Sequence, residues 1–114
     1  MRYALLLLIW ASACGGGSQA ISCDYRPDSA SQNVCVEWTQ YTATYHDDLV
    51  AGCLSPAVWT ERACARVGAL GGCKTTTESS IAVKWFFVDP ARQIATAADV
   101  MKECTSTGST FVEP

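Results

Sequence analysis

The sequence has few aliphatic side chains once its first residues are set aside. Leu, Ile, Val and Phe together number 18 among the 101 residues from Cys14 onward. So low a fraction is close to the composition of chains that fail to fold unaided. The length of 114 residues fits one domain and not two. The chain therefore needs a source of stability other than a large aliphatic core.

Several chemical signatures are also missing. There is no C-x-x-C pair and only one histidine, His46, which argues against a thioredoxin-like redox centre and against a zinc site. No G-x-S-x-G elbow and no Gly-rich phosphate loop with a Lys-Ser/Thr pair occurs. The formal net charge of −3 excludes the basic stripe that nucleic-acid binding requires. We expect no metal, no cofactor and no nucleic-acid partner, and the sequence favours a non-catalytic protein over an enzyme.

The first 13 residues are, by contrast, almost entirely apolar. Met1 and Arg2 form a short positively charged start, an apolar run follows, and the small residues of 11–13 precede Cys14. This order is typical of a secretory signal peptide, and the apolar part is too short to cross a bilayer as a helix. We predict that residues 1–13 are a signal peptide that is removed.

The segment Ala11-Ser12-Ala13-Cys14 resembles the lipobox of bacterial lipoproteins, in which Leu is usual where Ala11 stands. The resemblance implies that the Cys14 thiol receives a diacylglycerol and that the chain is cut just before it. Gly15 stands where an Asp tends to retain Gram-negative lipoproteins at the inner membrane, which implies a location at the outer membrane of a bacterial cell envelope. A diacylglyceryl group holds a protein on a membrane without further help, since two acyl chains bind stably. Ordinary cleavage after Ala13 is the alternative.

Counting cysteines distinguishes the two alternatives. Seven cysteines in an oxidising compartment leave one thiol without a partner, whereas lipidation of Cys14 leaves an even set of six. Three disulfides would supply the missing stability, each contributing about 3 kcal/mol in the chain-entropy model. Six cysteines allow fifteen pairings, and sequence alone does not choose among them. The six are Cys23, Cys35, Cys53, Cys64, Cys73 and Cys104.

The chain after the leader divides into two parts. Residues 14–22 are interpreted as the lipidated cysteine and a flexible tether, and residues 23–114 as a disulfide-stapled domain. Its expected fold class is small, disulfide-rich α+β, with a short antiparallel sheet packed with one or two helices. β-branched and aromatic runs predict strands. The predicted strands are 34–41, 81–88 and 109–112, and 58–60 is either a brief strand or an extended turn. The predicted loops are 24–33, 68–72 and 74–80.

Three helices are predicted. A short helix is expected at 46–53, and a second at 61–67 with Thr60 as its cap. The third follows Asp89, a good N-cap, with Pro90 at the first helical position. Its apolar stripe recurs at three- and four-residue spacing before Gly108. The stripe consists of Ile94, Ala97, Ala98, Met101 and Cys104.

Three groups of residues are candidates for a functional surface. On an extended strand, Trp85 and Phe87 point to one face and Phe86 to the other, so these aromatics are either covered core or an exposed partner site. Arg62 and Arg66 would share a helical face and hold an anion. The run His46-Asp47-Asp48 offers a general base with carboxylates, although adjacent helical residues diverge.

These observations predict a lipid-anchored cell-envelope protein with a structural or binding role. Its partners would be the membrane, through the anchor, and an envelope protein or polysaccharide. A hydrolase acting on envelope material is one alternative, which His46 beside Asp89 or Asp99 in a deep pocket would favour. A secreted inhibitor-like module is another, which export without an anchor would favour.

Overall fold

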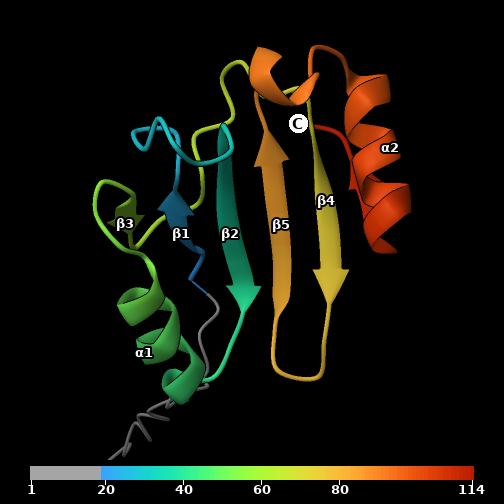
Figure 1. The fold of residues 1–114 in the computed structure, drawn as a ribbon. Coiled ribbons are helices and arrows are strands. Elements are labelled where there is room, and N and C mark those ends of the chain that lie inside the picture. The colour runs from blue at the N-terminus through green and yellow to red at the C-terminus, as the bar shows by residue number, and fades with distance from the viewer. Residues whose placement is uncertain (1–18) are drawn as a thin grey trace, which may run out of the picture.

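The computed structural model describes residues 19–114, so the predicted signal peptide and Cys14 lie outside the described residues. The fold is an antiparallel six-stranded sheet with the order β3-β1-β2-β5-β4-β6 and two α-helices (Figure 1). The strands are β1 (Ile21–Asp24), β2 (Val34–Gln40), β3 (Val58–Thr60), β4 (Gly71–Thr76), β5 (Ile81–Phe86) and β6 (Thr110–Val112). The helices are α1 (Ala43–Gly52), the 3-10 turn η1 (Pro90–Arg92) and α2 (Ala97–Thr107). The α+β class is confirmed, with a sheet larger than the short one expected.

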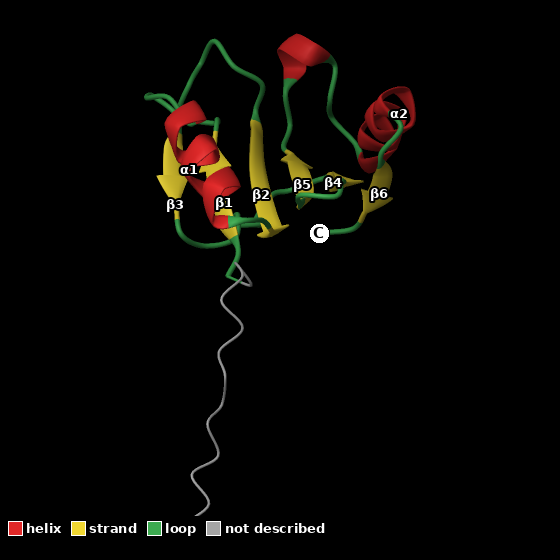
Figure 2. Cartoon of the chain, turned by 90° about the horizontal axis from the view of Figure 1, so that it is seen from below, coloured by secondary structure: helices red, strands yellow, loops and turns green. Residues whose placement is uncertain are grey.

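Both α-helices lie on the same face of the sheet, at its opposite ends. Figure 2 shows α2 above β4 and β6, and α1 in front of β3 and β1. Tyr45 and Leu49 of α1 pack in the cluster that contains Trp38. The central strands β2 and β5 alternate between the two faces. On the helical face lie Val34, Val36 and Trp38 with their partners Phe86, Lys84 and Ala82. Cys35 and Glu37, with their partners Trp85 and Val83, point to the other face.

Three disulfides bind the outer elements to the sheet. Cys23–Cys53 joins β1 to the residue after α1, and Cys73–Cys104 joins β4 to α2. The third, Cys35–Cys64, joins β2 to the segment 61–70, here called the cover loop, on the opposite face. The prediction that these six cysteines pair with one another is confirmed.

Each disulfide is the centre of one hydrophobic cluster. Ile21 and Trp38 pack around the bridge beneath α1, and Val100 with Phe86 around the bridge beneath α2. Trp85 and Phe87 pack around Cys35 and Cys64. The aliphatic content is thus divided into three small clusters, each of which is held by a covalent link.

The two longest predicted strands are confirmed, and three other predictions are wrong. Segment 61–67 is not helical, because Cys64 is bonded to Cys35 and the chain must follow the sheet. Residues 71–76, expected as turn and loop, form β4, where a side chain at Gly72 would come within 2.9 Å of Trp85. Residues 21 and 22, which belong to the predicted tether, are part of β1, where Ile21 is fully buried.

The helix boundaries also differ from the sequence prediction. α1 begins at Ala43, because the Thr42 hydroxyl accepts a hydrogen bond from a backbone N–H in the first turn. Pro90 starts only a single 3-10 turn, which ends at Gln93 in the left-handed region. α2 starts later, at a capping box formed by Thr96 and Asp99, and ends at Gly108 as predicted.

Candidate binding groove

The aromatic residues Trp85, Phe86 and Phe87 are 2%, 7% and 6% exposed. Trp85 and Phe87 pack beneath the cover loop, and Phe86 packs in the cluster beneath α2. Because both faces of β5 are covered at these positions, the aromatics are core, and their interpretation as an exposed partner site is wrong.

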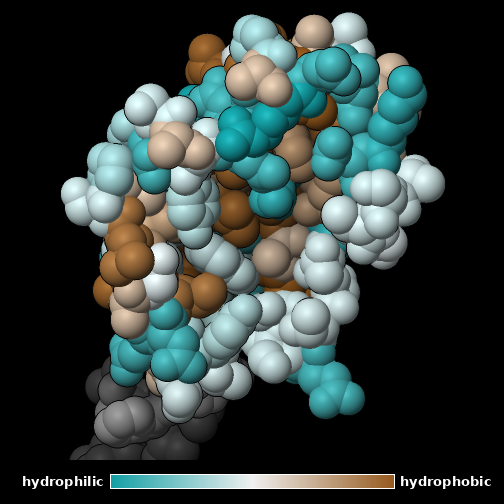
Figure 3. Space-filling model, viewed as in Figure 1, coloured by the Kyte–Doolittle hydropathy of each residue, from teal (hydrophilic) through white to brown (hydrophobic). Residues whose placement is uncertain are grey.

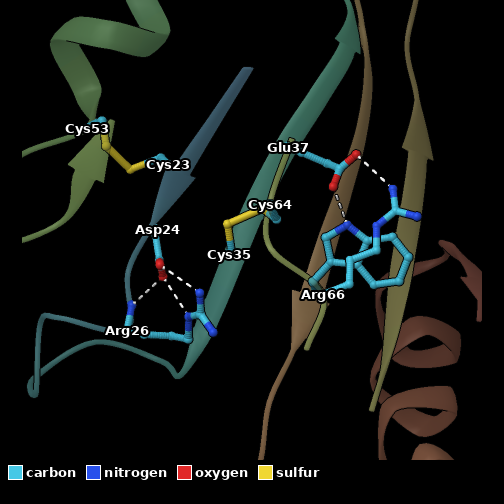
Figure 4. Close-up of a disulfide and its surroundings, with 9 residues drawn as sticks. Cys23, Asp24, Arg26, Cys35, Glu37, Cys53, Cys64 and Arg66 are labelled. Atoms are coloured by element: carbon cyan, nitrogen blue, oxygen red, sulfur yellow. Dashed lines mark hydrogen bonds and ion pairs between the residues drawn. A yellow bond between two sulfur atoms is a disulfide. The ribbon is translucent and has the colours of Figure 1, made fainter. Parts of the chain in front are cut away.

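The cover loop is locked onto the sheet by a buried carboxylate. Glu37 is 2% exposed and accepts a hydrogen bond of 2.6 Å from the Trp85 indole N–H. The Arg66 guanidinium lies 4.4 Å above the Trp85 ring. It also donates to the second Glu37 oxygen at 3.3 Å, and Figure 4 shows Arg66 and Glu37 joined in this way. Sequence reasoning missed Glu37, although an acidic residue inside the apolar run 34–38 is an available signal.

The expected pair of arginines does not form. Arg66 is engaged by Glu37 and Trp85, and the segment that carries Arg62 is irregular rather than helical. The two guanidinium groups therefore do not share a helical face, and the anion site predicted from their spacing is wrong.

His46 lies at the corner between α1 and β3, where its partner is Glu61. Its Nε2 is 2.9 Å from a Glu61 oxygen, and its Nδ1 is 3.3 Å from Asp47. The hydrogen bonds to Glu61 and then Asp47 raise the pKa of His46, and the same contact with His46 lowers the pKa of Glu61. The Trp59 indole N–H also donates to Glu61, at 3.2 Å. This is an exposed acid–base pair, and sequence reasoning missed Glu61 because it is 15 positions away.

Neither carboxylate that would have favoured a hydrolase lies beside His46. Asp89 accepts from the Asn33 backbone N–H and pairs with Arg92, and Asp99 belongs to the capping box of α2. Backbone and side-chain donors of Ala95 and Thr96 lower the pKa of Asp99. Both aspartates therefore have structural partners of their own.

A groove lies above β2 and β5, on the face of the sheet that carries both helices. Residues 25–32 of the loop before β2 line one side of it, and α2 lines the other. No residue of α1 is among its lining. Figure 3 views this face and shows apolar surface at its centre, with polar residues above it and to its right. We call this surface the central groove.

Two depressions form the groove and meet at Lys84. The first has a volume of about 290 Å³ and is lined by Tyr25, Ser31, Gln32, Val34, Val36 and Lys84. The second, of about 180 Å³, is lined by Cys73, Thr75, Lys84, Phe86, Glu103, Thr107 and Ser109. Apolar side chains make the floor, while hydroxyl, amide and charged groups surround it.

Lys84 is the central polar group of the groove. It is partly buried, its ammonium donates to the Gln32 side-chain oxygen at 3.1 Å, and it lies 5.6 Å from the Phe86 ring centre. Within residues 19–114 no carboxylate oxygen lies within 4 Å of it, whereas the other partly buried cation, Arg26, is paired with Asp24. Sequence reasoning missed Lys84, because Gln32 and α2 come from distant parts of the chain.

Comparison with known proteins gives no relative. No protein-family model matches the chain, and searches of curated proteins and of solved structures also found no match. Across the part that the structure describes, no His, Cys, Asp or Glu cluster has an arrangement suited to a metal ion. In the same range no helix has the length and apolar character needed to span a membrane. A functional assignment must therefore come from the groove and the sequence.

Proposed function

We propose that the protein is a lipid-anchored component of the bacterial cell envelope with a non-catalytic binding role, and that the central groove is its binding site. The observation that carries this proposal is the groove itself. The Cys73–Cys104 disulfide fixes α2 on β4, and the loop before β2 lies on the other side, so Val36 and Lys84 of the central strands stay partly exposed between them. A concave, preformed surface with an apolar floor and a few polar groups is typical of binding sites.

The cysteine pairing supports the anchor. The six cysteines from Cys23 to Cys104 are paired with one another, so Cys14 is the one cysteine that these bridges leave over. An oxidising envelope compartment favours such bridges, and lipidation would give the seventh sulfur a separate role. The fold begins seven residues after Cys14, a distance of at most about 25 Å even when fully extended. An anchored protein would therefore hold its groove near the membrane surface.

The position of the acid–base pair supports a non-catalytic role. His46 and Glu61 lie at the α1–β3 corner, and neither lines the two depressions of the groove. A general base must reach the proton that it removes from a bound substrate. A ligand in the groove would therefore lie away from the His46–Glu61 pair.

Site-specific photo-crosslinking in intact cells tests the binding role. A crosslinking amino acid at Thr75, which lines the groove, should capture an envelope component. The control position is Val67, which is 91% exposed on the cover loop at the other face. Equal capture from both positions, or none from Thr75, would contradict the assignment of the groove.

The anchor is tested separately. Cys14→Ser should leave the protein uncleaved or move it into the soluble fraction, because the acyl chains supply the membrane affinity. Fractionation followed by immunoblotting measures this. Membrane association of a cleaved Cys14→Ser protein would show that something other than lipid on Cys14 holds it.

A further inference from the structure

We infer that the central groove binds an acidic glycan, a saccharide chain that carries a carboxylate, and that Lys84 holds that carboxylate. This inference rests on the proposed binding role of the groove and adds the chemical class of the ligand. Three observations support it. Lys84 has no carboxylate partner within the described residues, hydroxyl and amide side chains lie around Lys84, and the strands beneath the groove are paired with one another.

The charge of the larger depression points to an anion. The sequence has 11 acidic and 8 basic residues, yet the lining of this depression contains Lys84 and no carboxylate, and Glu103 lines only the smaller one. The ammonium of Lys84 has three N–H donors, and the one hydrogen bond that it makes within the described residues is to the Gln32 oxygen. Partial burial of a charge without a counterion is unfavourable, so an anion that reaches Lys84 gains an ion pair. The single positive charge of the Lys84 ammonium is balanced by the single negative charge of one carboxylate.

The sheet beneath the groove argues against an extended peptide as the ligand. β2 pairs with β1 and β5, and β5 pairs with β2 and β4, so the backbone groups of the floor are used within the sheet. A peptide that binds as an added strand needs a free sheet edge. The groove offers side chains instead, so its ligand must be recognised through side-chain groups.

The polar groups around Lys84 match sugar hydroxyls. Ser31 and Gln32 lie on one side, and Thr75, Thr107 and Glu103 on the other. Hydroxyl and amide side chains both donate and accept, as sugar hydroxyls do, and Glu103 adds a strong acceptor. Together the two depressions fall in the lower half of the volume range of small-ligand sites, ~300–1,000 Å³. Because the two depressions meet at Lys84, a sugar unit whose carboxylate binds Lys84 would have a neighbouring unit in each depression.

Binding of defined oligosaccharides tests this inference. The full mature protein in detergent micelles is titrated with tetragalacturonate, with maltotetraose as the neutral ligand of the same length, by isothermal titration calorimetry. We expect the acidic tetramer to bind more tightly than the neutral one, and added salt to weaken its binding. Lys84→Gln should weaken it about tenfold, the effect of one charge-assisted hydrogen bond, and Lys84→Arg should retain most of it.

The matched control is Lys74→Gln. Lys74 is an exposed lysine on β4, where it pairs with Val83 and so lies on the opposite face from Lys84. Its replacement removes the same charge from the same sheet and should leave the affinity unchanged. Equal weakening by the two variants would overturn the inference, since it would indicate general electrostatic attraction rather than a site.

Two further results would also overturn the inference. One is no binding of tetragalacturonate by the unaltered protein at about 10 mM, since that limit is weaker than the millimolar affinity of a marginal ligand. The other is tighter, Lys84-dependent binding of tetraglutamate, which would make the ligand an acidic peptide. Crosslinking from Thr75 in intact cells separates the two proposals. If it persists, the binding role of the groove stands and only the glycan class fails; if it is absent, the proposed function fails as well.

Discussion

Replacing Trp85 with Phe should lower the free energy of unfolding by about 2 kcal/mol, because it removes the hydrogen-bond donor of a buried carboxylate. The Trp85 indole N–H donates to Glu37 at 2.6 Å, and the Glu37 side chain is 2% exposed. A hydrogen bond to a charged group contributes about 1.5–3 kcal/mol when its loss leaves a buried partner unsatisfied. Arg66 would remain as a partner at 3.3 Å, but 47% of its side chain is exposed, so it cannot replace the lost donor.

Trp59→Phe is the matched control. Trp59 also donates its indole N–H to a carboxylate, at 3.2 Å, but that carboxylate belongs to Glu61, which is 55% exposed and reaches water. The same chemical change should therefore cost much less at Trp59 than at Trp85. Trp85 is also the more deeply buried ring, so the loss of buried volume is separated from the loss of the hydrogen bond by a second background, Glu37→Gln.

Urea denaturation of the oxidised protein, followed by far-UV circular dichroism, measures both variants without relying on tryptophan fluorescence. Repeating Trp85→Phe in a Glu37→Gln background should reduce its cost by about 1 kcal/mol, because the lost hydrogen bond is then between neutral groups. Equal costs for Trp85→Phe and Trp59→Phe, or an equal cost of Trp85→Phe in both backgrounds, would refute the role of Glu37.

Three further predictions follow from other contacts. His46, the one histidine of the sequence, should titrate in NMR above its ordinary pKa of 6.5, and Glu61→Gln should return it towards that value. Because the pKa of His46 is raised and that of Glu61 lowered, their contact stabilises the fold most between pH 4.5 and 6.5. This contribution is lost as pH rises through the raised pKa or falls through the lowered one, and a stability profile identical in Glu61→Gln would contradict it. Replacing Cys73 and Cys104 together with Ala should cost about 3.7 kcal/mol in thermal or urea unfolding, since their bridge spans 31 residues; a loss below about 1 kcal/mol would contradict the chain-entropy account. Thr96→Ala should cost about 1 kcal/mol and increase amide exchange in the first turn of α2, whereas unchanged exchange would contradict the capping role.

The sequence predicted those parts of the fold that depend on local patterns. The runs at 34–41 and 81–88 are rich in β-branched and aromatic residues, and they became β2 and β5. The even number of cysteines after Cys14 predicted that they pair, and they do. The first signal lies in the residue types of a short segment, and the second lies in the number of cysteines.

The failures come from contacts between distant segments. Helical propensity and the Thr60 cap predicted a helix at 61–67, but the Cys35–Cys64 bridge and the stacking of Arg66 hold that segment against the sheet. β4 was missed because two glycines and several polar residues lack the strand pattern. Gly72 is nevertheless required there, because a Cβ atom would come within 2.7 Å of Val83 and 2.9 Å of Trp85.

The candidate site was beyond sequence reasoning for the same reason. The groove forms where the loop before β2 meets β5 and α2, and the Cys73–Cys104 bridge fixes α2 there. With the pairing undetermined, nothing marked Lys84 as central. Trp85 and Phe87, which the sequence suggested as a partner surface, are buried on the opposite face of the sheet from Lys84. Phe86 is buried in the cluster beneath α2.

Peptide mapping by mass spectrometry without reduction tests the central claim most directly, namely that one sulfur carries lipid while the other six are paired. The account predicts a mature chain that starts at a diacylated Cys14 and three linked peptide pairs, Cys23 with Cys53, Cys35 with Cys64 and Cys73 with Cys104. A bare Cys14, or Cys14 bonded to any other cysteine, would contradict it.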